Sequence, residues 1–144
     1  MNWMVILRKG EPVLEEMLQL VRSNERFREV GGIAAFIGVV RSTSNEGEEV
    51  DHLELEAYEE KLDDALVKIS NEIKERPGIV DVQIGHVVGN LEQGDLIMVV
   101  FVSGGSRKDV FPALIEAVER TKSEAPIWKK EVLSSGQSHW VNEK

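Results

Sequence analysis

The chain has 144 residues, of which 42% are hydrophobic and 30% charged, and this composition predicts one folded domain over residues 1–144. Its formal net charge of −9 argues against a broad nucleic-acid surface, because binding to phosphates requires clustered Lys and Arg side chains. The chain contains no cysteine, which excludes disulfide bonds, thiolate metal sites and cysteine nucleophiles.

The opening residues, MNWMVILRKGEP, predict a short strand over residues 2–9 rather than a signal peptide, because the apolar run is short and soon interrupted. No run of 18 apolar residues follows, so we expect a soluble protein of the cytoplasm that does not enter a membrane. The three histidines, His52, His86 and His139, lack the spacing of metal ligands, so we expect neither a metal site nor a cofactor.

The first half of the chain predicts two helices and two further strands. Apolar residues recur at helical spacing in residues 11–24 and 59–78. The stripe of the second helix consists of Leu62, Leu66, Ile69 and Ile73. Residues 31–41 form a nearly unbroken apolar run, which predicts a strand covered on both faces. Residues 50–58 alternate between apolar and polar side chains, which predicts a half-exposed strand.

The second half adds three strands and one helix. Residues 79–89 and 95–105 predict strands joined by the turn GNLEQGD, and residues 127–133 predict a last short strand. A helix is predicted from about Asp109 to Glu124, and a polar tail from about residue 134. Paired strands mix with crossover helices in this order, so we expect an α+β fold with a largely antiparallel sheet.

Lys122 continues the apolar stripe of the last predicted helix. At 100° per residue it lies within about 20° of Phe111 and Ile115, which together with Leu114 and Val118 form the stripe expected to face the core. Burial lowers the pKa of a lysine and makes it a nucleophile or proton carrier. The alternative is a lysine that extends into solvent from the helix C-terminus, where the macrodipole favours a cation.

Two other basic positions have both a functional and an ordinary interpretation. In FVSGGSRKDVF a strand leads into the last helix, and backbone amides there, beside Arg107 and Lys108, suit a phosphate or carboxylate. The alternative is a plain turn capped by Ser106, although Pro112 then lies deep in the helix, which favours a helix start nearer Asp109. An arginine that ends a strand, as Arg41 does, either points into a cleft or stays on the surface.

Six segments carry more specific motifs. They are FIGVVR (36–41), LELEAY (53–58), HVVGNLEQGD (86–95), SRKDVF (106–111), KSEAPIWKKE (122–131) and HWV (139–141). The most specific parts are the Lys-x-x-Ala-Pro-x-Trp-Lys signature and the His-x-x-Gly-x-Leu-x-x-Gly-Asp turn. Over roughly residues 30–141 the chain resembles one family, the large, catalytic subunit of molybdopterin synthase.

This resemblance implies an α/β-hammerhead with an additional antiparallel β subdomain, and a homodimer. Each end of the dimer is expected to bind a small ubiquitin-like sulfur-carrier subunit whose C-terminal Gly-Gly tail carries a thiocarboxylate, which gives a heterotetramer. The implied activity is that of a sulfurtransferase. It transfers two sulfurs to cyclic pyranopterin monophosphate and forms the dithiolene of molybdopterin in molybdenum cofactor biosynthesis. Because the sulfur arrives on the partner's tail, the catalytic chain needs no cysteine.

The resemblance also implies which residues act on the sulfur carrier. Lys122 and Lys129 match the two lysines on which the family relies, and we expect both to be catalytic. Lys122 is expected to do covalent or proton-transfer work on substrate or thiocarboxylate. Lys129 and Arg107, an anion-binding arginine of the family, are expected to hold the tail carboxyl group and to stabilise developing negative charge.

Further residues are expected to bind the pterin substrate. Arg41 matches another anion-binding arginine and is expected to hold the phosphate together with Lys108. Phe36 matches a pocket aromatic residue. Lys144 is the counterpart of a basic tail residue that the family supplies to the neighbouring subunit's pocket. Ser106 stands in the substrate site where the family commonly has a histidine, and a serine cannot replace a proton-transferring histidine at neutral pH.

Two departures from the family leave other functions open. Besides Ser106, the turn after residues 50–58 reads YEEK where the family has a Tyr-Pro-Gly-Met-like sequence, which changes the contact with the small subunit. One alternative is a non-catalytic scaffold that binds a ubiquitin-like tail. Another is a binding domain for phosphate-containing ligands that acts without a partner.

Overall fold

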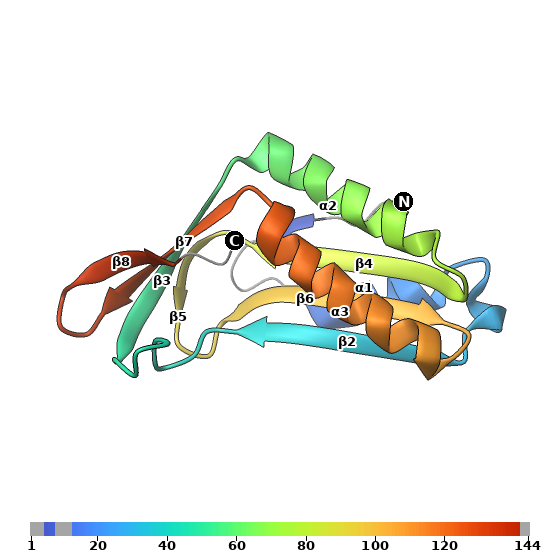
Figure 1. Cartoon of the computed structure of the whole chain (residues 1–144), viewed down its shortest axis with the longest axis horizontal. Helices are drawn as coiled ribbons and strands as arrows, with labels where there is room; N and C mark the ends of the chain where they lie inside the picture. Colours follow the sequence, from blue (N-terminus) through green and yellow to red (C-terminus); the bar gives the residue numbers. More distant parts are fainter. Residues whose placement is uncertain (1–4, 8–12, 142–144) are drawn as a thin grey trace.

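A computed structural model describes residues 5–7 and 13–141, which form two four-stranded sheets and three α-helices (Figure 1). The elements in chain order are β1 (Val5–Leu7), α1 (Val13–Arg22), a 3-10 helix (Phe27–Glu29), β2 (Gly32–Val39), β3 (Val50–Ala57), α2 (Glu59–Lys74), β4 (Ile79–Val87), β5 (Gly89–Glu92), β6 (Leu96–Gly104), α3 (Arg107–Glu124), β7 (Ile127–Leu133) and β8 (Ser138–Val141). The α+β class predicted from the sequence is confirmed.

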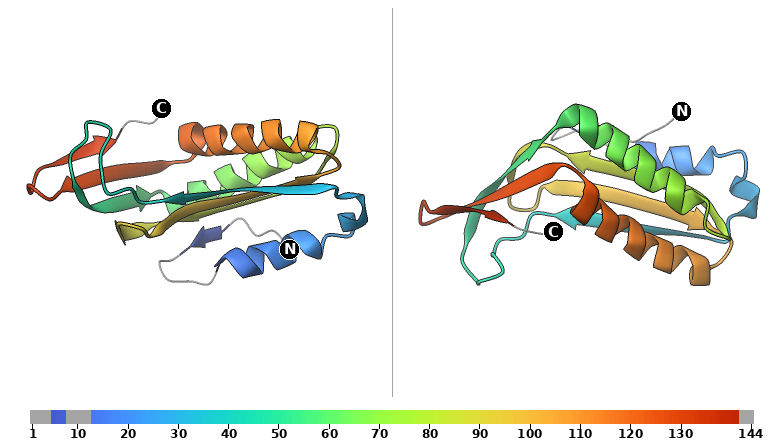
Figure 2. Two further views of the ribbon diagram at one scale, coloured as in Figure 1. Left: turned by 90° about the horizontal axis from the view of Figure 1, so that it is seen from below. Right: turned by 45° about the horizontal axis from the view of Figure 1, so that its top comes forward.

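The first sheet has the strand order β1-β4-β6-β2. Its β1–β4 pair is parallel, and the other pairs are antiparallel. Helices α2 and α3 cover one face of this sheet and α1 lies against the other (Figure 2). Each face therefore has its own hydrophobic core. The larger one contains the predicted stripe of α2, whose four members, Leu62, Leu66, Ile69 and Ile73, are all fully buried.

The second sheet has the order β5-β3-β7-β8 and is antiparallel throughout. It projects from one end of the first sheet (Figure 1), so the arrangement agrees with the additional antiparallel subdomain implied by the family resemblance. Five connections cross between the sheets: β2 to β3, β3 through α2 to β4, β4 to β5, β5 to β6, and β6 through α3 to β7. Side chains near these crossings come together although they are distant in the sequence.

Two short strands of the second sheet differ from the sequence prediction. Gly89–Glu92 was expected to be a turn, but it forms β5 and pairs with β3. Residues 138–141 were expected to belong to a polar tail, but they form β8 on the edge of the same sheet. Each strand has four residues, too few for a period-2 pattern to distinguish a strand from a turn.

The prediction that residues 31–41 are covered on both faces is wrong. The strand β2 lies at the edge of the first sheet, and Ile33, Phe36, Ile37 and Val39 are exposed. A continuous apolar run is typical of a central strand, but it is also produced by an edge strand whose outer face contacts another molecule. The sequence does not distinguish these two cases.

The predicted core stripe of α3 is also only partly correct. Phe111 and Ile115 are 55% and 64% exposed, whereas the small residues Ala113 and Ala117 face the sheet, followed by Thr121. Small side chains let α3 approach the sheet closely, so the bulky apolar residues lie on the outer flank of the helix. Lys122, which shares that flank, is exposed.

The helix α3 begins earlier than predicted and continues through a proline. Ser106 is its N-cap, and the Ser106 hydroxyl accepts a hydrogen bond from the backbone N–H of Lys108. Pro112 lies inside the helix, in its second turn. The carbonyl left without a helical donor there is that of Lys108, an exposed residue, so water can solvate it at little cost.

Arg120 ties the last turns of α2 and α3 together. Its Nε donates to Glu124 Oε2 at 2.7 Å and its Nη2 donates to Glu72 Oε1 at 2.5 Å. The hydrogen bond from Arg120 lowers the pKa of Glu124, although burial opposes this. Because Glu124 ends α3, this ion pair holds the end of the helix that carries Lys122.

We predict that Arg120→Met lowers the free energy of unfolding by about 1 kcal/mol or less at pH 7, since the Glu124 side chain is 39% exposed. Glu124 has a folded-state pKa below its ordinary value of 4.5, so its stabilising contribution is present above that value and is lost as the pH falls through the folded pKa. Urea unfolding at pH 7 and at pH 3 measures the difference, which should shrink at the lower pH.

The control is Lys61→Met, which removes an exposed cation from α2 and should change stability by less than about 0.5 kcal/mol at both pH values. An equal loss at pH 7 and pH 3 in Arg120→Met would mean that packing of the arginine stem, not its charge, holds the two helices.

Candidate functional site

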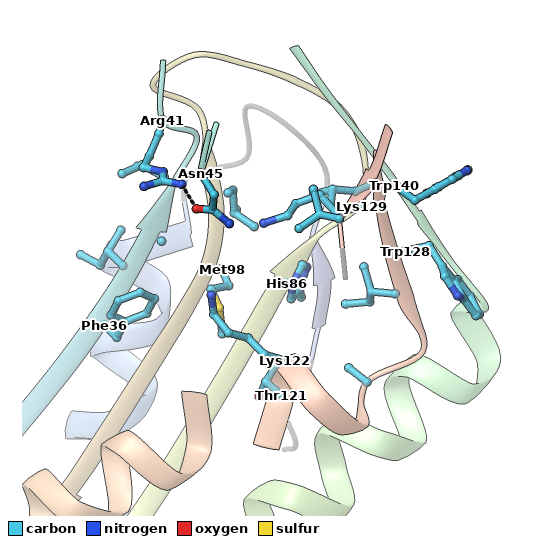
Figure 3. Close-up of a pocket in the computed structure, with 18 residues that line it drawn as sticks. Phe36, Arg41, Asn45, His86, Met98, Thr121, Lys122, Trp128, Lys129 and Trp140 are labelled. Atoms are coloured by element: carbon cyan, nitrogen blue, oxygen red, sulfur yellow. Dashed lines mark hydrogen bonds between the residues drawn. The ribbon is translucent and has the colours of Figure 1, made fainter. Parts of the chain in front are cut away.

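A cavity of about 710 Å³ opens where the two sheets meet (Figure 3). Its walls come from the ends of β2, β4 and β6, the last turn of α3, and strands β7 and β8. A cavity of this size suits a small molecule or an extended peptide end. Strands of both sheets and the connections after β2 and α3 line it, so its geometry depends on how the two sheets are joined.

The cavity is cationic although the chain as a whole is acidic. Arg41 follows β2, Lys122 lies in the last turn of α3, and Lys129 lies on β7. In Figure 3 the side chains of Lys122 and Lys129 extend into the cavity from opposite walls. Among the described residues that line it there is no Asp or Glu. Three cations without a lining carboxylate make a local site for anions.

Arg41 is held by its own loop. Its Nη2 donates a hydrogen bond of 2.6 Å to the Oδ1 of Asn45, which also lines the cavity. The loop is closed by a β-bridge between Thr43 and Glu49 and by a backbone hydrogen bond from Gly47 to Ser44. This support directs the guanidinium toward the cavity, where it can bind a phosphate with two parallel hydrogen bonds.

Lys122 lies in the cavity wall, but not for the reason predicted. The sequence argument required this amine to be buried, and the structure shows an exposed residue. Lys122 follows Thr121, whose hydroxyl donates to the carbonyl of Ala117, and α3 ends two residues later. The exposure of Lys122 therefore agrees with the alternative interpretation, a lysine that extends into solvent from the C-terminus of the helix.

Three predicted site residues lie far from this cavity within one chain. Ser106, Arg107 and Lys108 are exposed at the N-terminal end of α3, whereas Lys122 is in its last turn. Fifteen residues of α-helix separate Arg107 from Lys122, which corresponds to about 22 Å. The expected pairing of Arg107 with Lys129, and of Lys108 with Arg41, is not found inside a single chain.

The structure describes one of the two remaining predicted residues. Phe36 lines the cavity from β2, as expected of a pocket aromatic. Lys144 lies outside the described residues. Sequence reasoning missed Asn45, His86 and Met98, which also line the site. For His86 a signal existed, since it opens the His-x-x-Gly-x-Leu-x-x-Gly-Asp motif.

Two tryptophans lie at the edge of the cavity on the side of the second sheet, and in Figure 3 their rings are directed away from Lys122 and Lys129. Trp128 lies on β7 and Trp140 on β8, and both are about half exposed while also lining the cavity. The Nζ of Lys130 lies 5.8 Å from the centre of the Trp140 ring, within the range of a cation–π contact. The two rings therefore present apolar surface beside the cavity rather than inside it.

Comparison with known proteins agrees with this arrangement. The family model described as MoaE protein matches residues 8–124. The chain is 38% identical over 128 residues to the molybdopterin synthase catalytic subunit of Pyrococcus abyssi, which covers 89% of this chain and 82% of that protein. It is 39% identical over 116 residues to the subunit of the same name from Bacillus subtilis, which covers 81% and 73% of the two chains.

Solved structures show the same fold. The crystal structure of molybdopterin synthase from Staphylococcus aureus superposes with a TM-score of 0.82 at 34% identity, over 99% of this chain and 98% of that chain. A complex of subunits 1 and 2 of the molybdopterin-converting factor from Helicobacter pylori contains a chain with a TM-score of 0.73 at 21% identity, over 98% and 90% of the two chains.

The fold and site thus define a small α+β protein with a cationic, aromatic-lined cavity between two sheets. The chain belongs to the MoaE family, the catalytic subunits of molybdopterin synthase, which act in molybdenum cofactor biosynthesis. In the described part of the chain, no helix is long and apolar enough to cross a membrane. The same residues contain no cluster of three His, Asp or Glu side chains able to hold a metal ion.

We predict that Asn45→Ala weakens the binding of inorganic phosphate to the cavity by roughly 3- to 10-fold, because Arg41 loses the hydrogen bond that orients it. Isothermal titration at fixed ionic strength measures the affinity. The control Ser42→Ala alters an exposed side chain of the same loop and should leave the affinity unchanged. Equal affinity in Asn45→Ala and the unmodified protein would show that Arg41 needs no such support.

Proposed function

We propose that this chain is the sulfur-transferring subunit of a molybdopterin synthase. A small ubiquitin-like partner with a thiocarboxylated C-terminal glycine supplies the sulfur, and cyclic pyranopterin monophosphate accepts it. The observation that carries the proposal is the presence of Lys122 and Lys129, the two lysines of the family signature, in one cavity with Arg41. Family membership supports the same reaction.

Each cation has a separate role in this proposal. Arg41 binds the phosphate of the substrate, because a guanidinium held by Asn45 presents a fixed pair of donors. Lys129 stabilises the negative charge that develops on the tail carbonyl when the sulfur is transferred. Lys122 contacts the thiocarboxylate, itself an anion, and acts on it directly. The tail enters as an extended chain end past the rim of the cavity, beside Trp128 and Trp140.

A small partner subunit fits both the absence of cysteine and the shape of the site. With no thiol of its own, the chain needs a carrier to bring sulfur to the cavity. The Helicobacter pylori neighbour, related to this chain in fold, was solved as a complex of two subunits. In this proposal the partner docks beside the second sheet, where Tyr58, Trp128 and Trp140 leave apolar surface exposed next to the cavity.

The apolar outer flank of the first sheet supports a homodimer. Exposed Ile33 and Ile37 lie on the edge strand β2, which α3 borders, and α3 carries exposed Phe111 and Ile115 on the opposite face of the sheet from these two isoleucines. Ile115 stands near the middle of α3, about equally far along the chain from Arg107 and from Lys122. A two-fold axis near Ile115 sets the start of one α3 beside the end of the other, so that Arg107 of one copy reaches the cavity of its partner.

We predict that Lys122→Ala and Lys129→Ala each reduce product formation at least about 100-fold, since each removes a cation from the reacting groups. The assay mixes the protein with a thiocarboxylated small subunit and the pyranopterin substrate, and detects the dithiolene product by mass spectrometry. Lys130→Ala is the matched control, because Lys130 neighbours Lys129 on β7 but does not line the cavity.

Partner binding is measured in parallel by titration calorimetry. Retained binding with lost product supports a catalytic role for the lysines. Unchanged product formation in Lys122→Ala would remove Lys122 from the mechanism. If the unmodified protein binds the partner but forms no product, the scaffold function is favoured. If it binds the pterin phosphate tightly with or without the partner, a partner-independent binding domain is favoured.

We also predict that Ile115→Glu converts the protein from a dimer to a monomer, because two like charges would be buried at the proposed axis. Sedimentation velocity at about 10 μM measures the change. Leu18→Glu is the control, since Leu18 is a partly exposed apolar residue of α1 on the opposite face of the sheet. A dimer that persists in Ile115→Glu would place the interface elsewhere.

A further inference from the structure

We propose that His86 is the proton donor and acceptor of this site, and that Nε2 is the nitrogen that exchanges the proton. The inference rests on the proposed sulfur transfer and adds a residue to it. His86 is 7% exposed and lines the same cavity as Arg41, Lys122 and Lys129. No role followed for it from the sequence motif in which it occurs.

The position of His86 follows from the alternation of β4. Side chains two apart along a strand share a face, so His86 continues the row of Val82 and Ile84, which pack under α2 and α3. His86 pairs with Met98 of β6, and both side chains reach the cavity at the point where α3 ends. In Figure 3 the His86 ring lies at the base of the cavity, between the walls that carry Lys122 and Trp128. A buried row that is otherwise apolar thus ends in an imidazole at the site.

A backbone contact determines which nitrogen can exchange a proton. The Nδ1 of His86 lies 2.9 Å from the carbonyl oxygen of Val87. A carbonyl oxygen can only accept, so Nδ1 carries a hydrogen and donates it. In the neutral ring Nε2 is then the acceptor, and in the protonated ring Nε2–H is the bond that can release a proton while the contact with Val87 persists.

His86 is the one imidazole among the described residues that line the cavity. The sequence analysis assigned proton transfer to Lys122 because it expected the Lys122 amine to be buried. In the structure Lys122 is exposed. The histidine common in the family is replaced by Ser106, which lies at the far end of α3. Among the described residues, the charged side chains that line the cavity are those of Arg41 after β2, Lys122 on α3 and Lys129 on β7. Guanidinium and ammonium groups are as a rule cations at neutral pH, whereas imidazole gains and loses a proton there.

The proposed step is a single proton transfer. When the thiocarboxylate sulfur bonds to a carbon of the substrate, the bond between that carbon and its oxygen breaks. The departing oxygen takes the proton from Nε2–H. A departing hydroxyl group then leaves as water, and a departing phosphate oxygen becomes a hydroxyl group of the phosphate. The imidazole is then neutral, keeps its Nδ1–H bond to Val87, and regains a proton from solvent before the next transfer.

The charges of the site link ligand binding to this proton. A protonated His86 shares the cavity with Arg41, Lys122 and Lys129, whose positive charges repel its own. A bound phosphate, or the thiocarboxylate, neutralises part of that charge and favours the protonated ring. Binding of an anion should therefore take up protons from solution, and this uptake should depend on His86 alone among the three histidines of the chain.

The closing experiment measures proton uptake without the partner. Inorganic phosphate is titrated into the protein at pH 7.5 by calorimetry in buffers of different ionisation enthalpy, under conditions that correct for the protonation of phosphate itself. We expect uptake of a measurable fraction of a proton in the unmodified protein and in His139→Asn, and less than a third of that uptake in His86→Asn. Asparagine can still donate to the Val87 carbonyl but offers nothing in place of Nε2.

The same variants are then assayed for single-turnover product formation between pH 5.5 and 8.5. We expect His86→Asn to react about 100-fold more slowly, with a flatter pH profile and phosphate affinity within about twofold of the unmodified protein. His86→Gln is the second variant should Asn disturb folding, which urea unfolding checks. Rescue of His86→Gly by added imidazole would support proton transfer, because a structural role is not restored in this way.

The two proposals fail in different ways. Proton uptake that survives in His86→Asn, or an unchanged rate and pH profile, overturns the role of His86 whether or not the protein makes product. Loss of proton uptake in His86→Asn supports that role even if the unmodified protein yields no dithiolene, a result that overturns the sulfur transfer instead.

Discussion

The site depends on the way α3 ends and the chain crosses into the second sheet. Ala125 closes the helix with a hydrogen bond from its N–H to the carbonyl of Thr121, and the backbone N–H of Tyr58 donates to the carbonyl of Pro126. These bonds join the crossing to the end of β3, where Ala57 pairs with Ile127. Pro126 disfavours the helical conformation at Ala125, which is extended, so the chain turns between Lys122 and Lys129. Two lysines seven residues apart thereby reach one cavity from a helix and a strand.

Local and overall charge have opposite signs in this protein, and the difference has a consequence for binding. The chain carries a formal charge of −9, but the described lining of the cavity contains cations and no carboxylate. Exposed carboxylates discourage nucleic acids and other polyanions from the outer surface, while the cavity attracts a small anion at short range. An acidic protein can therefore be selective for a small phosphate-bearing ligand, because only a ligand that fits the cavity escapes the repulsion.

Much of the fold could be predicted from the sequence because its core elements have strong periodic patterns. The stripe of α2 and the apolar run of β6 are buried as expected, and β4 is buried along its whole length as well. The failures occur where the pattern depends on a partner or on close packing. The apolar run of β2 looks like a central strand, but the strand lies at the edge of the sheet. In α3 the alanines face the sheet and the bulky residues face outward, which reverses the usual relation between size and burial.

The candidate site was predicted less completely, since its residues belong to seven helices and strands and no local pattern connects them. Arg41, Phe36, Lys122 and Lys129 were named from motifs and do line one cavity. Arg107 was named from the same kind of motif and lies about 22 Å along α3 from Lys122. A motif records which residues a function uses, but not whether one chain or two supply them.

The exposed flank connects these discrepancies. If β2 and α3 meet a second copy, the apolar run of β2 becomes internal, the outward-facing Phe111 and Ile115 become buried, and Arg107 approaches the cavity of the other chain. One contact thus accounts for three departures from the sequence prediction, each of which has a different local explanation in the isolated chain. His86 needs no second copy, because it already lines the cavity of a single chain. Proton transfer would then be supplied by each chain for itself, whereas binding of the substrate's anionic groups would be shared across the dimer.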